Sequence, residues 1–267
     1  MPVVFAGIAP HPPLLVPEVG GDRIAQIAGS QRALREFSGR LIATQPDSVV
    51  VVSPHSPMDP SVFTARSTAE LAGDFRDFYA RQVSVTFPND LELISAIQRS
   101  ATSEETELAL HERNYPLDHG AMVPLYYLHE AGWRGPIVVI GFTNQSTEKH
   151  LSFGRAIAQA AGEIDRRVAI VASGDLSHRL LVGGPYEFEP TAHLFDEQIV
   201  DAISRGEPRA MMNIDPGLRS RAGECGYRSI VVALGTVEGM AGVNEVLSYE
   251  GPFGVGYMVA VLGEKKC

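Results

Sequence analysis

Residues 48–55 read Ser-Val-Val-Val-Val-Ser-Pro-His. The four consecutive valines do not alternate with polar residues, so we expect a strand over residues 48–53 that is covered on both faces. Pro54 cannot donate a hydrogen bond to a strand ladder and therefore ends the strand. A strand of this kind is typical of a parallel sheet between two layers of helices, and His55 follows its end directly.

Segments of the same kinds alternate along the rest of the chain. Apolar runs predict buried strands over residues 3–8, 137–140 and 168–172. Amphipathic or apolar stretches predict helices over residues 22–43, 90–100, 122–130, 151–164, 193–204 and 228–237. This alternation indicates βαβ units, so we predict an α/β fold with three layers, α/β/α, around a central mixed, mostly parallel sheet.

Two parts of the chain depart from this pattern. Residues 56–81 show no clean period, and we predict a short edge strand near Phe63 followed by a mobile loop. Residues 83–87 alternate between apolar and polar side chains and predict a further strand. Residues 243–249 and 255–262 are strand-like and are joined by a short turn, so they predict an antiparallel edge to the sheet.

Composition and charge exclude several classes of protein. With 45% hydrophobic residues among 267, the chain can bury a large core and is not expected to be disordered. A net charge of −10 argues against nucleic acid or an anionic membrane as a partner. Cys225 and Cys267 are too few for a disulfide framework or a four-thiolate zinc site. The apolar runs are too short to span a membrane and no signal-peptide pattern is present, so we expect a cytoplasmic protein with free thiols.

Four of the eight histidines stand where ligands bind in such folds. His11, His55 and His178 follow predicted strands, and His119 lies at the start of a predicted helix. Ligands of open α/β sheets sit beyond the carboxyl ends of the strands. Prolines beside His11 and His55 restrict the backbone and hold each imidazole in one direction, as a metal site requires. The other four are expected to be structural or solvated: His111, His129, His150 and His193.

The stretch Ala-Gly-Glu-Cys-Gly-Tyr at residues 222–227 offers a carboxylate and a thiolate as further ligands. Two histidines and one carboxylate form the pattern of non-haem Fe(II) that activates oxygen. Glu224 also has a structural explanation, because the helix macrodipole favours a glutamate near a helix N-terminus. Asp175 and Ser177 beside His178 are weak evidence for a nucleophilic triad, since the serine is not on a Gly-x-Ser-x-Gly elbow.

With these residues in hand, the chain resembles the LigB-type class III extradiol dioxygenase superfamily, and within it the Memo-like branch of the AmmeMemoRadiSam system. The matching segments run in family order from one end of the chain to the other: residues 9–17, 51–55, 117–125, 173–179, 224–226 and 247–257. The resemblance implies a single domain over residues 1–267, with a three-layer α/β/α fold and no fused AMMECR-type domain.

The resemblance also implies metal ligands. His11 and His55 match the two histidine ligands of the family. Glu224 matches the ligand glutamate of true dioxygenases, whereas Cys225 matches a cysteine of Memo-type relatives. We favour Glu224 as the third ligand, because a facial triad needs an anionic oxygen more than a thiolate, and keep Cys225 as the alternative.

Three catalytic residues follow from the same resemblance. His178 matches the acid–base histidine of the family, and His119 matches a second histidine that lines the pocket. Asp175 is expected to line the pocket and to orient His178, since a carboxylate partner fixes the tautomer of an imidazole. The aromatic-rich residues 75–79 either pack in the core, which we favour, or cap the pocket.

These assignments imply an Fe(II) enzyme, with Zn or Mn as alternative metals, that opens the ring of a small aromatic diol with O₂. Two other functions stay open. One is a Memo-like metal-binding or regulatory protein without catechol turnover, and the other is a metal-dependent hydrolase that activates water with the same ligands. The resemblance further implies AMMECR-type and radical SAM partner proteins and a homo-oligomer.

Overall fold

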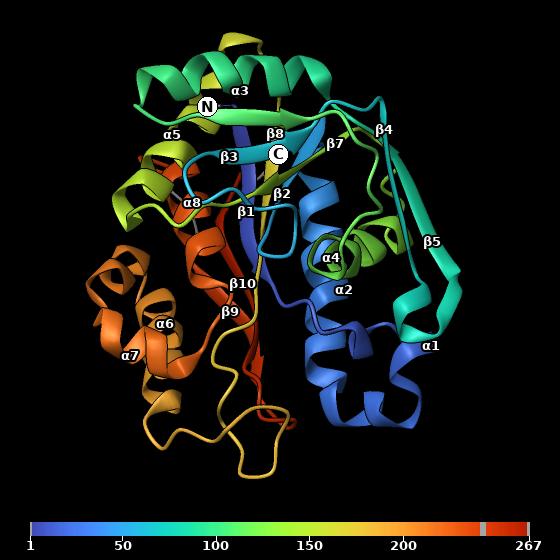
Figure 1. Cartoon of the computed structure of the whole chain (residues 1–267), viewed down its shortest axis with the longest axis vertical. Helices are drawn as coiled ribbons and strands as arrows, with labels where there is room; N and C mark the ends of the chain where they lie inside the picture. The colour runs from blue at the N-terminus through green and yellow to red at the C-terminus, as the bar shows by residue number, and fades with distance from the viewer. Residues whose placement is uncertain (1, 241–243, 266–267) are drawn as a thin grey trace.

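A computed structural model describes residues 2–240 and 244–265, and its centre is an eight-stranded sheet with the order β6-β3-β7-β2-β8-β1-β10-β9 (Figure 1). The strands are β1 Val3–Ala9, β2 Ser48–Ser53, β3 Phe63–Arg66, β4 Glu70–Phe75, β5 Ala80–Pro88, β6 Leu108–His111, β7 Ile137–Gly141, β8 Val168–Ser173, β9 Glu245–Glu250 and β10 Tyr257–Glu264. Neighbours among β7, β2, β8 and β1 are parallel, whereas β10 pairs antiparallel with β1 and β9. The predicted mixed, mostly parallel sheet is confirmed.

Helices cover both faces of this sheet. The helices are α1 Pro17–Gly20, α2 Ala28–Ala43, α3 Leu91–Ser103, α4 His119–Glu130, α5 Thr147–Glu163, α6 Ala192–Ser204, α7 Pro216–Ala222 and α8 Tyr227–Thr236. Alternate valines of β2 enter two separate cores. Val49 and Val51 pack with α2 and α4, whereas Val50 and Val52 pack with α3, α5, α6 and α8. The unbroken valine run is therefore buried on both faces, as predicted, and the fold has three layers.

The parallel register brings the carboxyl ends of three central strands together. Ser173, the last residue of β8, pairs with Ala9, the last residue of β1. On the other side of β8, Ala172 pairs with Val52, which lies next to the end of β2. The segments that leave β1, β2 and β8 therefore start at one edge of the sheet, where the sequence places its candidate ligands.

The segment between β2 and α3 differs from the expected edge strand and mobile loop. β3 lies inside the sheet between β6 and β7, because β6, a four-residue strand that the sequence pattern did not reveal, takes the edge. β4 and β5 pair antiparallel as a separate two-stranded sheet at the right of Figure 1. Leu71, Phe75, Val85 and Phe87 bury the inner side of this hairpin. The strand predicted over residues 83–87 lies within β5, whereas β4 takes the place of part of the expected loop.

The antiparallel edge predicted near the carboxyl end is confirmed as β10 and β9, although Val243, where the first of these strands was expected to begin, lies outside the described residues. Cys267 lies outside them as well, and Cys225 is a free thiol. In residues 2–240 and 244–265, no helix combines the length and the apolar character needed to cross a membrane.

Candidate metal centre

Three possible ligand side chains meet beyond the carboxyl ends of β1, β2 and β8. The Nε2 atom of His11 lies 3.1 Å from Nε2 of His55 and 3.5 Å from Sγ of Cys225. All three atoms lie within 4.8 Å of one another. Nitrogen and sulfur ligands sit about 2.0–2.3 Å from a zinc-sized ion, so ligands of one ion are separated by roughly 3–4 Å. The spacing and the donor set fit a single transition-metal ion.

His11 is held in the tautomer that a metal ligand needs. The Ser173 hydroxyl donates to the backbone oxygen of Gly120, so its oxygen accepts a hydrogen bond from Nδ1–H of His11 at 2.9 Å. This assignment leaves the lone pair of Nε2 facing the cluster. The sequence does not distinguish Ser173 as a functional residue, because a serine at the end of a buried strand carries no signal of its own.

Asp118 ties the turn that carries His55 to the start of α4. Its carboxylate accepts hydrogen bonds from the hydroxyls of Ser53 and Ser56, at 2.5 and 2.7 Å, and from the backbone N–H of Ala121 at 3.0 Å. The last of these is an N-cap, which explains why α4 begins directly after Asp118. An aspartate just before a predicted helix is an N-cap signal, but its second role, at the His55 turn, has no signature in the sequence.

Glu224 does not join the cluster. Its Oε2 accepts a 2.6 Å hydrogen bond from the backbone N–H of Tyr227, and its Oε1 lies 3.8 Å from Nε of Arg219. The carboxylate therefore stabilises the N-terminus of α8. This is the structural role that the sequence suggested for a glutamate near a helix N-terminus. The structure places Cys225 beside His11 and His55, and this corrects our placement of Glu224 as the third ligand.

Two glycines allow Cys225 to approach the sheet edge. A Cβ atom on Gly174 would lie 2.1 Å from Cα of Gly226, so the turn after β8 and the turn before α8 touch through their backbones. The backbone N–H of Gly226 donates to the oxygen of Asp175 at 3.0 Å. Neither contact tolerates a side chain, and together they bring the thiol to the histidines.

Aromatic rings surround the cluster. The His119 ring lies 4.1 Å from that of His55, and Phe78 meets His119 edge to face at 5.6 Å. Tyr186 stacks on His178 with 5.0 Å between the ring centroids. Of the aromatic residues 75–79, Phe75 is in the core, as we favoured, whereas Phe78 reaches the candidate pocket. The predicted catalytic histidines therefore both lie at the cluster.

The Nε2 atom of His178 is buried and has no hydrogen-bond partner in the part of the chain that the structure describes. Its backbone N–H donates to the oxygen of Ala222 at 3.0 Å, which fixes the main chain on the Cys225 side of the site. A buried nitrogen without a partner costs about 1–3 kcal/mol, so this atom is available to a bound group.

Burial keeps the histidines neutral. It lowers the pKa of His11 well below its usual value, and the neighbouring imidazole of His55 lowers it further. Burial, followed by the nearby His55, lowers the pKa of both His119 and His178 to about 4. Neutral imidazoles have a free lone pair, which is the form that binds metals.

Burial also favours the neutral forms of Cys225 and Asp175, and it does so by raising their pKa values. Burial raises the pKa of the Cys225 thiol well above its usual value, and the Asp175 carboxyl beside it raises it further. Burial also raises the pKa of Asp175 to about 7, although a hydrogen bond from the backbone N–H of His11 opposes the shift. A bound cation would stabilise both anions and reverse these shifts.

Asp175 contacts His11, and not His178 as expected. Its Oδ1 accepts the backbone N–H of His11 at 2.9 Å, and its Oδ2 lies 4.0 Å from Nε2 of the same residue. Within the described residues no hydrogen bond joins Asp175 to His178, because the Asp175 side chain faces β1. Asp175 lines the site, as the sequence predicts, but the orientation of His178 comes from Tyr186 and the backbone.

Comparison with known proteins agrees with this geometry. Residues 6–260 match the family model of the catalytic LigB subunit of aromatic ring-opening dioxygenase. The chain belongs to the LigB family. Its likeness to the uncharacterized protein JW3007 from Escherichia coli K12, with a TM-score of 0.57 and 17% identity over 84% of this chain and 91% of that one, shows the fold alone.

Curated relatives of this LigB-family chain include named dioxygenases. It is 26% identical to a 4,5-DOPA dioxygenase extradiol of Beta vulgaris, over 66% of this chain and 66% of that protein. It is also 26% identical to a 2,3-dihydroxyphenylpropionate/2,3-dihydroxicinnamic acid 1,2-dioxygenase of Mycobacterium ulcerans, over 74% of this chain and 62% of that protein. Protein CA_C1420 of Clostridium acetobutylicum is 35% identical over 96% of this chain. The LigB-family chain spans only 56% of the length of that relative.

Proposed function

We propose that this LigB-family protein is an Fe(II)-dependent dioxygenase that opens the ring of a small aromatic diol with O₂. The observation that carries the proposal is the meeting of His11 Nε2, His55 Nε2 and Cys225 Sγ, with His178 close enough to act on the pKa of His11. The Nε2 atom of His178 has no hydrogen-bond partner among the described residues. The family and the named dioxygenases among the relatives support the ring-opening reaction. Zn and Mn are the alternative metals for a site with nitrogen and sulfur donors.

His11, His55 and Cys225 are the residues that would hold the metal. The chemistry supplied by bound Fe(II) is the joint binding of diol and O₂ and the exchange of electrons between them. Ser173 keeps His11 in the binding tautomer, and Asp118 fixes the turn of His55. These two residues act through the ligands and touch no reacting atom.

His178 is the proposed general base. With a pKa of about 4 its imidazole is neutral near pH 7, and its buried Nε2 can accept a proton from a hydroxyl of the diol. Once protonated, the same nitrogen can return the proton when the ring opens. His119, on the His55 side of the cluster, is the second group that can hold a proton.

Phe78 and Tyr186 form the apolar part of the same site. Phe78 stands against His119, and Tyr186 against His178, so an aromatic ring entering between the histidines meets aromatic surfaces on both sides. Ring–ring contacts of this kind contribute about 0.5–1.5 kcal/mol each. They favour an aromatic substrate and exclude water from the proton-transfer groups.

Cys225 favours a second candidate function. A thiolate in place of the carboxylate of the usual facial triad is a softer ligand, which suits a metal-binding or regulatory protein of the Memo-like type without diol turnover. This alternative uses the same three ligands and the same metal. It differs from the first proposal in the absence of O₂ consumption.

The test is O₂ uptake by anaerobically Fe(II)-loaded protein mixed with a panel of catechols. The first proposal expects one O₂ consumed per diol and a coloured ring-fission product, with both lost in His178→Gln at unchanged iron content. Full iron content without uptake supports the Memo-like alternative. Hydrolysis of phosphate esters or peptides by the Zn or Mn form, without O₂ uptake, indicates the metal-dependent hydrolase.

Partners and location are part of the same proposal. The proposed small-molecule partners are the diol and O₂. The proposed protein partners are AMMECR-type and radical SAM proteins and a second copy of this chain, acting in the cytoplasm. Light scattering of the purified chain and co-purification with tagged candidates test these associations, and a monomer that retains no candidate contradicts them.

A further inference from the structure

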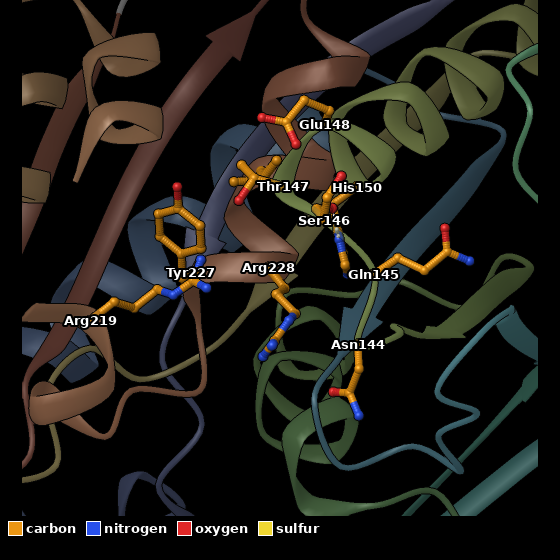
Figure 2. A pocket seen from close by; sticks show the side chains of 10 residues that line it. Asn144, Gln145, Ser146, Thr147, Glu148, His150, Arg219, Tyr227 and Arg228 are labelled. Carbon is orange, nitrogen blue, oxygen red and sulfur yellow. Dashed lines mark hydrogen bonds between the residues drawn. The ribbon is translucent and has the colours of Figure 1, made fainter. Parts of the chain in front are cut away.

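A pocket separate from the metal cluster lies between the N-terminus of α5 and residues of α7 and α8 (Figure 2). It encloses about 260 Å³, and none of the three cluster residues lines it. Its lining is polar except for Val231 and comes from the segment 144–150, from Arg219 of α7, and from Tyr227 and Arg228 of α8. Its size suits a small ligand, since pockets for drug-sized molecules start at about 300 Å³.

Two guanidinium groups share one carboxylate in this pocket. Nε of Arg219 lies 3.8 Å from Glu224, whose other oxygen is occupied by the backbone N–H of Tyr227. Arg228 forms no ion pair or hydrogen bond within the described residues, and its guanidinium lies 5.5 Å from the centre of the Phe142 ring. Burial lowers the pKa of Arg228, the nearby Glu224 carboxylate opposes that shift, and the charge of Arg219 lowers the pKa again. The pocket therefore holds a partly desolvated cation whose nearby carboxylate is shared with Arg219.

The N-terminus of α5 adds to the positive potential. This helix has 17 residues, and its cap, Ser146, accepts the backbone N–H of Lys149 at 3.3 Å. The N-terminus of a helix carries about half a positive charge and attracts anions. Glu148 is the acidic residue at this end and also lines the pocket (Figure 2). Hydrogen bonds from its own backbone N–H and from the Ser146 hydroxyl lower the pKa of its carboxyl, so Glu148 offsets part of this positive potential.

His150 braces the wall of the pocket at the first turn of α5. Its side chain is fully buried, and Nδ1 donates a hydrogen bond to the backbone oxygen of Ser146 at 2.8 Å. This bond helps to hold the N-terminal turn of α5 against the pocket.

We propose that this pocket binds a compact oxyanion of the phosphate class, either free or as the terminal group of a small metabolite. The guanidinium of Arg228 faces the pocket without a carboxylate of its own, and an arginine fork matches two phosphate oxygens. The N-terminus of α5 and Arg219 complete a positive wall around the bound group. The site depends on no residue of the metal cluster and does not rest on the dioxygenase proposal.

Titration calorimetry of the purified full chain, at fixed and measured metal content, tests this site. Inorganic phosphate is titrated at constant ionic strength, with chloride as the reference anion and glycerol phosphate as the ester. We expect saturable binding at one site, weakened at least about tenfold in Arg228→Gln. Arg228→Lys keeps the charge but loses the fork, so it is expected to bind with intermediate affinity. The control is Arg99→Gln, an equal loss of charge at an exposed arginine of α3 that lines neither site.

Arg219 is the poorer choice for this test, because its replacement also releases Glu224 beside Cys225. Tighter binding of glycerol phosphate than of phosphate assigns the site to a metabolite, and the reverse order assigns it to the free ion. Binding that is equally strong in Arg228→Gln, or heat that never saturates above the chloride reference, overturns the proposal. Folded Arg228→Lys keeps the comparison valid if the glutamine variant does not fold.

Discussion

The Nε2 atom of His11 and the Sγ atom of Cys225 lie 3.5 Å apart, although 214 positions separate the two residues along the chain. The end of β8 makes this contact. Ser173 holds the ring of His11, and Gly174 gives the backbone of Gly226 room to pack against the sheet. The end of β8 therefore positions both His11 and Cys225. Substitutions that disturb either contact are expected to weaken metal binding.

Cys225→Ala and Glu224→Gln are expected to separate the two candidates for the third ligand. The cysteine variant loses a donor of the cluster, so its metal affinity falls by at least the roughly 10–100-fold seen for supporting residues. The glutamine variant keeps its hydrogen bond from Tyr227 and retains the metal of the wild type. Elemental analysis after dialysis against a chelator measures both. His11→Ala and His55→Ala, which are expected to lose bound iron, serve as references, and loss of metal only in the glutamine variant would restore Glu224 as ligand.

Asp118→Ala is expected to lower the free energy of unfolding by about 2–4 kcal/mol, because it leaves two serine hydroxyls and one backbone N–H without their acceptor. The control is Asp215→Ala, which removes only the N-cap of α7, a 2.8 Å bond to the N–H of Leu218. That loss is expected to cost about 1 kcal/mol. Urea denaturation measures both values, and equal losses would show that the bridge to the His55 turn adds nothing.

The three layers of the fold could be predicted because unbroken apolar runs indicate strands that are buried on both faces. The valine run of β2 can be buried only between two layers of helices. Because the neighbouring strands are parallel, their carboxyl ends lie at one edge of the sheet, and His11, His55 and His178 follow those ends. The order of the strands does not follow in the same way. β6 is only four residues long, and its pairing with β3 depends on contacts that no local pattern records.

The site could be predicted in its residues but not in its contacts. Glu224 and Cys225 are adjacent, so every sequence pattern that includes one includes the other, and the choice depends on which side chain faces the sheet. Backbone contacts of Gly226 decide it. Tyr186 could not have been placed against His178 for a related reason, since it lies in the segment between β8 and α6 that has neither helix nor strand and no periodicity to read.

The metal-free protein is expected to lose stability as the pH falls from about 6.5 to about 4. His178 has a pKa of about 4 in the folded chain and an ordinary value near 6.5 when unfolded, so the unfolded chain binds its proton first. The stability linked to this residue is present above pH 6.5 and is lost as the pH falls through that window, by up to about 3 kcal/mol. Urea denaturation of the wild type and of His178→Gln across this range measures it, and identical slopes would contradict the assignment.

Asp196 is expected to give the opposite dependence of folding stability on pH. Burial raises its pKa to about 7, so the folded chain holds this proton more tightly than the unfolded chain does. Stability from this group is fully present below the unfolded pKa of about 4 and is lost as the pH rises from about 4 to about 7. Asp196→Asn keeps an acceptor for the backbone N–H of Ser177, replaces the other oxygen with an NH₂ that can donate to the Tyr249 hydroxyl, and removes the titration. Its unfolding free energy, measured by urea denaturation, is therefore expected to fall less than that of the wild type between pH 5 and pH 7.

Tyr186→Ala is expected to raise the pKa of His178 toward its ordinary value, because the stacked ring is part of what keeps water from the imidazole. Tyr186→Phe retains the ring and is expected to leave the pKa unchanged. Titration of the histidine ring signals by NMR in metal-free protein measures the shift without any assumption about turnover. A pKa that stays near 4 in the alanine variant would mean that burial by other residues is sufficient.

Ser173→Ala is expected to weaken metal binding by about 10–100-fold while leaving all three ligands in place. The serine oxygen accepts Nδ1–H of His11, and without that acceptor the ring can turn or take the other tautomer, which puts a proton on the nitrogen that should bind. The matched control is Ser229→Ala, which removes another fully buried hydroxyl, one that donates to the backbone oxygen of Ser173 at 2.7 Å. Competition with a chromophoric chelator gives the affinities. If both alanine variants bind metal equally well, the hydrogen bond to His11 does not set the tautomer, and the position of Nε2 comes from the proline-flanked turn alone.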